Sequence, residues 1–151
     1  MTKSTYEMVS PSNDNCVIVA AVDYGRKWIG IAATAGHGVV FPAGVIEQHS
    51  RRHSLEAVRQ RLAELGAERV IVGWPINMDG SAGTQAVAAE KFADELRQMS
   101  GLAVDMFDER LTSYEASERL SALPRHHRRS QRVDAVAACI ILESWLQNSK
   151  R

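Results

Sequence analysis

Short apolar runs alternate with longer amphipathic segments along most of the chain. The first continuous run, residues 17–23 (VIVAAVD), has the length and composition of a strand that is buried on both faces. Residues 28–34 and 39–47 indicate two further strands, and the Gly-His-Gly sequence between them is a hairpin signal. We therefore expect three adjacent antiparallel strands at the start of the fold.

The middle of the chain alternates helical and strand patterns. Residues 51–65 repeat apolar side chains three or four positions apart, and a glycine follows as a helix stop. The short apolar runs at 69–73 and 102–107 predict a fourth and a fifth strand, the fourth parallel to the first. Between these strands we expect a helix over residues 81–99, with Ser81 as its N-cap.

The end of the chain predicts two more helices. One opens at Thr112 with capping-box spacing and must stop before Pro124, and the other covers residues 133–147. The resulting order, βββαβαβαα, predicts an α/β fold with a five-stranded mixed sheet, three antiparallel strands and then two parallel ones, flanked by helices on both faces.

The length of 151 residues fits one domain. Residues 1–15 are polar and are interpreted as a flexible N-terminal tail, and residues 16–148 as a single domain without internal repeats. No apolar stretch is long enough to span a membrane, and the first residues lack the apolar core of a signal peptide. We therefore expect a cytoplasmic protein that does not enter a membrane.

Composition narrows the possible functions. Lys plus Arg and Asp plus Glu are both 18, so the net charge is zero and a protein that binds nucleic acid over its whole surface is excluded, whereas a local basic stripe is not. The two cysteines, Cys16 and Cys139, show no C-x-x-C spacing. They argue against a disulfide framework and a structural zinc site and favour a reducing cytosol.

Three acidic residues stand at positions where ligands bind in α/β folds. Asp23 ends the most apolar strand, Glu109 follows the fifth strand, and Asp134 opens the last helix. A single acid is usually a solvated surface group, and Asp134 would also complement the dipole of its helix. Ligands bind outside the carboxyl ends of parallel strands, however. If the last helix brings Asp134 beside the other two, three carboxylates converge.

Converging carboxylates repel one another unless cations neutralise them. A pair of Mg²⁺ or Mn²⁺ ions would do so, and two such ions can promote phosphodiester cleavage. We therefore predict that Asp23, Glu109 and Asp134 bind metal and are the catalytic residues of a nuclease. Asp108 is either a fourth metal ligand or a solvated acid at a strand end, and the sequence favours neither interpretation.

The loop between the fourth strand and the next helix is the second candidate feature. Gly73, Gly80 and Gly83 would let the backbone approach a ligand, and a helix starting at Ser81 would favour an anion. The same Asn-x-Asp-Gly sequence is also common turn chemistry. Trp74 either stacks on a base or packs locally.

The third candidate feature is the basic connector PRHHRRSQR (124–132), which precedes Asp134. A run of charge is usually a solvated face, but arginines beside a metal site suit a phosphate backbone, and two cations also follow Asp23. The predicted nucleic-acid contacts are Arg26, Lys27, Asn77, Ser81, Arg110, Arg125, Arg128, Arg129 and Arg132.

Four segments of the chain resemble the motifs of the YqgF (RuvX-like) family, in the same order. They are DYGRKWIG (23–30), VGWPINMDGSAG (72–83), DERLTSYEA (108–116) and VDAVAACIIL (133–142), and the resemblance covers residues 17–146. It departs at Trp74, where a smaller apolar residue is more usual.

The resemblance implies a fold similar to ribonuclease H and the RuvC resolvases. It implies that Asp23, Glu109 and Asp134 are catalytic carboxylates that bind divalent metal. It also implies a nuclease that matures the 5′ end of pre-16S ribosomal RNA in the bacterial cytoplasm, or a Holliday-junction resolvase.

Our leading hypothesis is a metal-dependent endonuclease that acts on structured RNA, with pre-16S ribosomal RNA as the best candidate. The closest alternative applies the same chemistry to a four-way DNA junction, which needs two symmetric cuts and hence a homodimer, so monomer and homodimer both stay open. A third hypothesis is an assembly factor that binds ribosomal RNA without cutting it. A nucleotide-binding protein of the actin-like or sugar-kinase type would need a second lobe, for which this chain is too short.

Overall fold

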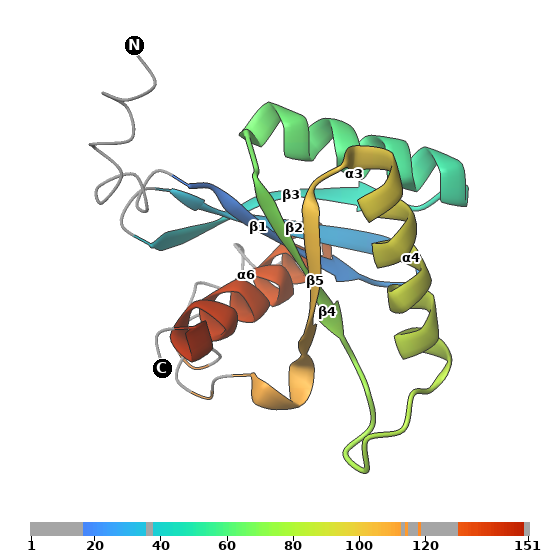
Figure 1. The fold of residues 1–151 in the computed structure, drawn as a ribbon, viewed down its shortest axis with the longest axis vertical. Coiled ribbons are helices and arrows are strands. Elements are labelled where there is room, and N and C mark those ends of the chain that lie inside the picture. Colours follow the sequence, from blue (N-terminus) through green and yellow to red (C-terminus); the bar gives the residue numbers. More distant parts are fainter. Residues whose placement is uncertain (1–16, 36–37, 113, 115–117, 119–129, 150–151) are drawn as a thin grey trace.

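A five-stranded mixed sheet forms the centre of the molecule (Figure 1). The computed structural model describes residues 17–35, 38–112, 114, 118 and 130–149, with the side chains of the last helix described from residue 135. The strand order is β3-β2-β1-β4-β5. The strands are β1 (Val19–Tyr24), β2 (Trp28–Ala35), β3 (Val39–Glu47), β4 (Arg69–Trp74) and β5 (Ala103–Asp108).

The pairing of the strands confirms the predicted topology. β1 pairs with β2 and β2 with β3 in antiparallel fashion, whereas β1 pairs with β4 and β4 with β5 in parallel. Each predicted strand boundary lies within two residues of the observed one. Continuous apolar runs locate buried strands well, because a strand in the middle of an α/β sheet has no polar face.

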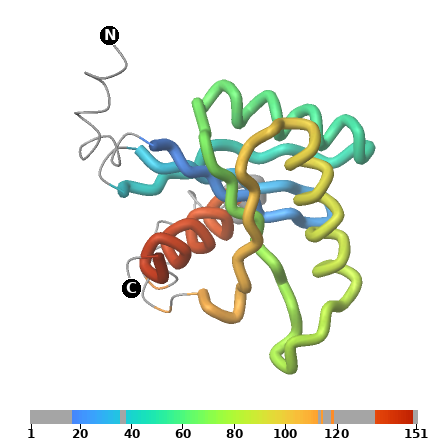
Figure 2. The backbone as a smooth tube through the Cα atoms, in the orientation of Figure 1, coloured from blue at the N-terminus to red at the C-terminus, as the bar shows by residue number. Residues whose placement is uncertain are grey.

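Helices cover both faces of this sheet, as predicted (Figures 1 and 2). Helices α3 (Arg51–Leu65) and α4 (Thr84–Ser100) pack on one face, α6 (Ser130–Ser149) packs on the other, and a 3₁₀ turn, η1 (Glu109–Leu111), follows β5. None of the described helices is both long and apolar enough to cross a membrane.

Helix α4 begins later than predicted. Its N-cap is Gly83 and its first residue is Thr84, so the prediction that Ser81 caps this helix is wrong. The backbone N–H and the hydroxyl of Ser81 both donate to the carboxylate of Asp79 instead. Side chains that can cap a helix can also close a turn, and here the turn takes the serine.

The elements predicted near the two ends of the chain can be compared with the structure only in part. Helix α6 starts at Ser130, three residues before the predicted 133. The predicted tail at residues 1–15 and most of the helix expected between Thr112 and Pro124 lie outside the described residues.

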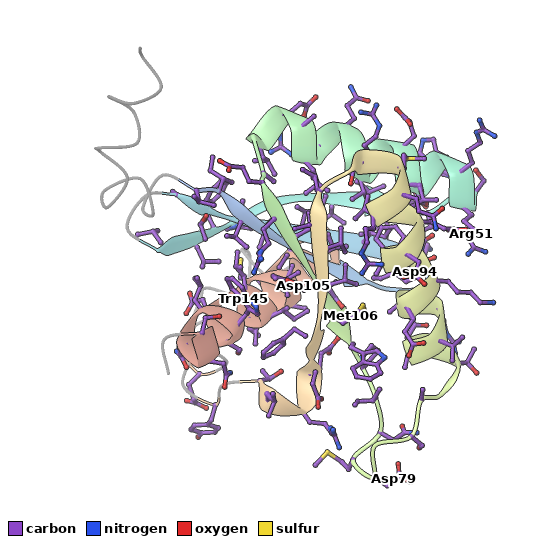
Figure 3. All side chains as sticks on the ribbon, in the orientation of Figure 1. Arg51, Asp79, Asp94, Asp105, Met106 and Trp145 are labelled. Atoms are coloured by element: carbon purple, nitrogen blue, oxygen red, sulfur yellow. The ribbon has the colours of Figure 1, made fainter. Side chains whose placement is uncertain are left out.

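Alternating side chains of β1 contribute to two separate cores, and Figure 3 shows side chains filling both sides of the sheet. Ala20 and Val22 belong to the core under α3 and α4, whereas Val19 and Ala21 belong to the core under α6. The same alternation continues to the end of the strand, because successive side chains of a strand point to opposite faces. Asp23 therefore belongs to the α6 face, and Tyr24, which packs against the first core, to the α3/α4 face.

Candidate active site at the carboxyl edge of the sheet

The carboxyl ends of β1, β4 and β5 lie side by side at one edge of the sheet. Val22 pairs with Val72, and Gly73 pairs with Phe107, so that Asp23 and Gly73 follow at the same level. Glu109 comes two residues after Phe107, as the first residue of η1. The parallel register thus brings two of the predicted carboxylates to the same edge.

Gly73 makes room for the side chain of Glu109. A methyl group on the Cα of Gly73 would lie 2.5 Å from Oε2 of Glu109 and 2.6 Å from Cδ1 of Ile141 in α6. The Glu109 carboxylate therefore lies directly over the β4 backbone, beneath α6. The side chains of Glu109 and Ile141 occupy the space at Gly73, which favours packing within the protein over the approach of a ligand.

Glu109 lies in surroundings that disfavour its negative charge. Burial raises the pKa of Glu109 to about 7, and the negative charges of Asp23 and Asp108 add to this effect. Asp23 is half-buried and close enough for its charge to be felt at Glu109. Two carboxylates held together in this way favour a bound proton or a cation.

The raised pKa of Glu109 predicts that the metal-free protein is less stable at alkaline pH. An unfolded glutamate titrates near 4.5, so between about 4.5 and 7 the folded protein keeps a proton that the unfolded chain has released. The free energy of unfolding should therefore fall as the pH rises through this window, by at most about 3 kcal/mol. Urea unfolding with EDTA at pH 5 and pH 8 measures this difference.

A Glu109→Gln variant is the control for this pH dependence. The amide cannot ionise, so the variant should lack most of the loss between pH 5 and pH 8. A wild type and a variant with the same pH profile would contradict the assignment of the proton to Glu109.

Helix α6 places Asp134 near the same edge. The guanidinium of Arg69, at the start of β4, lies 5.9 Å from the ring centroid of Trp145, whereas Ile141 lies over Gly73 near the end of β4. Trp145 therefore lies nearer the start of β4 and Ile141 nearer its end, so the turns of α6 before Ile141 extend toward the carboxyl edge. Asp134 precedes Ile141 by seven residues, or about 10 Å along the helix.

The predicted meeting of three carboxylates stays a prediction, because the side chain of Asp134 is outside the described residues. Among the side chains that the structure describes, no group of three His, Cys, Asp or Glu residues is arranged to hold a metal. What the structure describes is the pair formed by Asp23 and Glu109.

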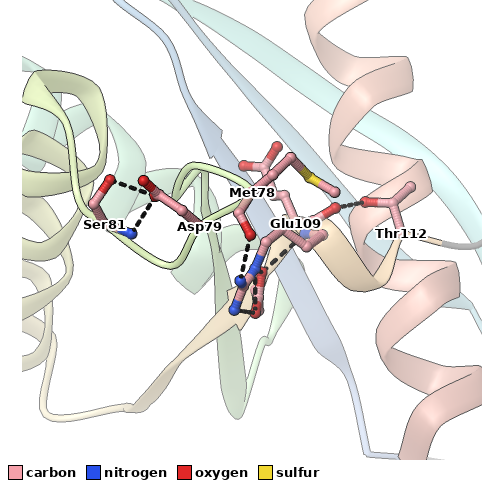
Figure 4. A network of polar contacts seen from close by, with 7 residues as sticks. Met78, Asp79, Ser81, Glu109 and Thr112 are labelled. Carbon is pink, nitrogen blue, oxygen red and sulfur yellow. Dashed lines mark hydrogen bonds and ion pairs between the residues drawn. The ribbon is translucent and has the colours of Figure 1, made fainter.

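Asp108 is held by Arg110 (Figure 4). Its carboxylate caps η1 by accepting from the Arg110 backbone N–H at 2.9 Å, and it pairs with the Arg110 guanidinium, Nη2 lying 2.7 Å from Oδ2. This hydrogen bond lowers the pKa of the Asp108 carboxyl. The two roles account for Asp108 as a structural acid and favour that interpretation over a fourth metal ligand.

Arg110 also ties η1 to the loop after β4. Its Nη1 donates to the carbonyl oxygen of Met78 at 3.3 Å. Within the loop, Asn77 donates from Nδ2 to the Ser81 hydroxyl at 2.9 Å. The Ser81 hydroxyl donates to Asp79 at 2.6 Å, as Figure 4 shows. The loop is thus closed by its own turn chemistry, and the predicted contacts of Asn77, Ser81 and Arg110 with nucleic acid stay predictions.

Trp74 and Cys139 have local structural roles. The indole of Trp74 donates to Oε2 of Glu90 at 2.7 Å and so joins the end of β4 to α4. This bond favours local packing over base stacking. Cys139 is 1% exposed in the core under α6, and burial raises the pKa of its thiol to about 12.

The predicted basic residues are described only in part. Arg26 and Lys27 are exposed in the turn between β1 and β2, and the Lys27 ammonium lies 5.9 Å from the centroid of the Trp28 ring. They come three and four residues after Asp23, in the turn beside the carboxyl edge. Arg125, Arg128 and Arg129 lie outside the described residues, and Arg132 lies in α6 with its side chain undescribed.

Sequence reasoning missed two cations near this edge. Arg51 and Lys91 line a cleft of about 670 Å³ on the α3/α4 face, together with Tyr24. A single exposed cation on a helix gives no periodic signal. The Arg-Arg-His sequence at the start of α3 was the only local hint.

Comparison with known proteins points to one family. The family model described as "RuvX: Holliday junction resolvase" matches residues 17–148. Curated relatives from Myxococcus xanthus (strain DK1622) and Anaeromyxobacter sp. (strain Fw109-5) are both named "Putative pre-16S rRNA nuclease". The first is 41% identical over 130 residues, covering 83% of this chain and 84% of the relative. The second is 39% identical over 127 residues, covering 83% of this chain and 93% of the relative.

Solved structures of resolvases share the fold. RuvC of T. thermophilus in complex with a Holliday junction substrate matches with a TM-score of 0.60 at 14% identity, covering 88% of this chain and 96% of that one. The fowlpox virus Holliday junction resolvase matches with a TM-score of 0.53 at 13% identity, covering 89% of this chain and 100% of that one. These matches confirm the expected likeness in fold to RuvC.

Proposed function

This chain belongs to the RuvX family, and from that membership we propose that it is a metal-dependent endonuclease that matures the 5′ end of pre-16S ribosomal RNA. The supporting observation is the pair of half-buried carboxylates, Asp23 and Glu109, at the carboxyl edge of the sheet. Ligand sites of α/β folds lie at this edge.

The chemistry of the donor set fits a divalent cation. Asp23 and Glu109 offer hard oxygen ligands, which Mg²⁺ and Mn²⁺ prefer. Burial and the negative charge of Asp23 both disfavour the charge of Glu109, as its raised pKa indicates, and a bound cation would offset these effects. We propose Asp23, Glu109 and Asp134 as the residues that would hold the metal.

The bound metal, Glu109 and the neighbouring cations would have different roles at the phosphate that is cleaved. A bound metal supplies Lewis acidity and lowers the pKa of the attacking water. Gly73, which has no side chain, leaves the space over β4 that the Glu109 carboxylate occupies beside Ile141. Arg26 and Lys27 are exposed next to Asp23, where they would bind phosphates on either side of the cleaved bond.

Cleavage of a precursor RNA tests this proposal. The purified full-length chain, given RNA that contains the 5′ end of pre-16S ribosomal RNA, should cut it with Mg²⁺ or Mn²⁺. EDTA should abolish the cutting, and added metal should restore it. Cleavage that persists unchanged in EDTA would contradict metal dependence, and salt-dependent RNA binding without cleavage would favour the assembly factor.

A four-way DNA junction is the second substrate to test. The description of the family model and the shared fold with RuvC both favour it as the alternative. A resolvase should make paired symmetric cuts and act as a dimer. Cutting of the junction with no cutting of the RNA would replace the proposed substrate and leave the proposed carboxylates unchanged.

A further inference from the structure

A cleft opens on the face of the sheet that lies opposite the carboxylates. It has a volume of about 670 Å³ and lies between the end of β1, the start of α3 and the first turns of α4. Arg51 also borders a second hollow along α3, which Arg52 lines together with two acids, Glu56 and Glu95. The lining residues of the cleft are Tyr24, Arg51, Ala82, Gly83, Thr84, Val87, Ala88 and Lys91.

The cleft carries positive charge and no negative charge on its walls. Its two charged lining residues are Arg51 and Lys91. Arg51 pairs with Glu95 through Nε at 2.7 Å, which fixes the direction of its side chain. Lys91 and Arg52 are exposed, and neither forms an ion pair within the part of the chain that the structure describes. A molecule whose net charge is zero thus has a local basic surface here.

The same surface continues to the turn after β1. The backbone N–H of Gln48 donates to the carbonyl oxygen of Lys27 at 2.8 Å, so the turn with Arg26 and Lys27 lies against the segment that leads into α3. The side chain of Gln85, in the first turn of α4, donates to the carbonyl oxygen of Tyr24 at 2.7 Å. Cations from three elements are therefore held around the end of β1.

The end of β1 joins this surface to the candidate active site. Asp23 belongs to the α6 face, and the next residue, Tyr24, lines the cleft and stacks on Phe92 with ring centroids 4.4 Å apart. Consecutive Cα atoms are only about 3.8 Å apart. A polyanion that crosses the sheet edge at this point would pass from the carboxylates to the cleft without leaving the protein surface.

We propose that this cleft and the adjoining hollow bind the phosphodiester backbone of the RNA beyond the cleaved bond, with Lys91 and Arg51 contacting phosphates in the cleft and Arg52 contacting one in the hollow. The inference rests on the proposed function, because it takes structured RNA as the ligand. Contacts of this kind give affinity that falls with salt and carries no sequence information. The surface therefore sets how tightly RNA is held, whereas the carboxylates act on the bond.

A Lys91→Gln/Arg52→Gln double variant tests the proposal. Binding of the 5′ pre-16S RNA by the full chain is measured by filter binding in EDTA, over a range of KCl concentrations. Two lost phosphate contacts should lower the slope of log Kd against log salt by about 1.4 to 1.8. At low salt the Kd should rise roughly tenfold. Both residues are exposed, so the melting temperature should stay close to that of the wild type.

The matched control is Arg59→Gln. Arg59 lies on the same helix as Arg52, pairs with Glu56 and does not line the cleft. Its loss should leave both the Kd and the salt slope unchanged. An equal drop in slope for the control and the double variant would overturn the assignment of the contacts to this cleft.

The outcomes separate this inference from the proposed function. A double variant that binds RNA with the wild-type slope overturns the inference, whether or not the protein cleaves RNA. If the wild type binds RNA without cleaving it, and the double variant has a lower salt slope, the inference is supported and the proposed nuclease activity is contradicted. If the double variant loses salt slope only with a four-way DNA junction, the RNA assignment is overturned. The same holds if the wild type does not bind RNA.

Discussion

An Asp23→Asn variant should cleave RNA at least about a thousandfold more slowly than the wild type. The amide keeps the size of the side chain but removes the negative charge that would hold a cation beside Glu109. Single-turnover cleavage with saturating enzyme isolates this effect from binding. The variant should also show a lower pKa at Glu109, because a neighbouring like charge is gone.

Asp105→Asn is the control for this loss. Asp105 lies on β5, is about half exposed and pairs with Arg69 at 3.5 Å at the other end of the sheet. Surface ion pairs contribute about 1 kcal/mol at most, so this variant should keep its activity and nearly all its stability. Wild-type cleavage by Asp23→Asn would end the catalytic assignment of the pair.

Gly73→Ala should lose on the order of a hundredfold in activity while the protein still folds. The new methyl group would lie 2.5 Å from Oε2 of Glu109 and 2.6 Å from Cδ1 of Ile141, so both side chains must move. Misplacing a catalytic group by about 1 Å can cost a hundredfold in rate. Overpacking in a core costs about 1 to 3 kcal/mol, which urea unfolding would show. Cleavage and unfolding are measured on the same preparation.

Two further variants separate the two contacts. The single Ile141→Val variant is the control, because it removes Cδ1 without adding a methyl group at Gly73. Adding Ile141→Val to Gly73→Ala removes Cδ1 and should restore part of the stability, but not the activity, since Glu109 stays displaced. Activity that returns with the stability would show that Glu109 does not need its place over Gly73.

The sheet could be predicted from the sequence because its strands are short, apolar and buried on both faces. Residues 17–23 and 69–73 differ from their surroundings strongly enough to identify β1 and β4. The start of α4 could not be predicted, because Ser81 is equally suited to cap a helix and to close the turn with Asp79. Only the folded loop shows which of the two roles it takes.

Asp23 and Glu109 were predicted to lie close together because each stands at or just after the end of a strand, and the parallel register explains why they do. The role of Gly73 could not be predicted, because the sequence shows that a glycine at a strand end leaves space but does not show which group fills that space. The pairing of Asp108 with Arg110 was open for a similar reason. Two residues apart, they meet only because η1 turns the chain.

The opposite directions of Asp23 and Tyr24 make β1 intolerant of any change in length. One residue inserted or deleted ahead of Asp23 would exchange the two side chains. The carboxylate would then enter the apolar layer beside Phe92, and the phenol ring would take its place beside Glu109. The strand can accept substitutions, but not an insertion or deletion ahead of Asp23. We therefore expect the number of residues from the start of β1 to Asp23 to stay the same in every active variant of this chain.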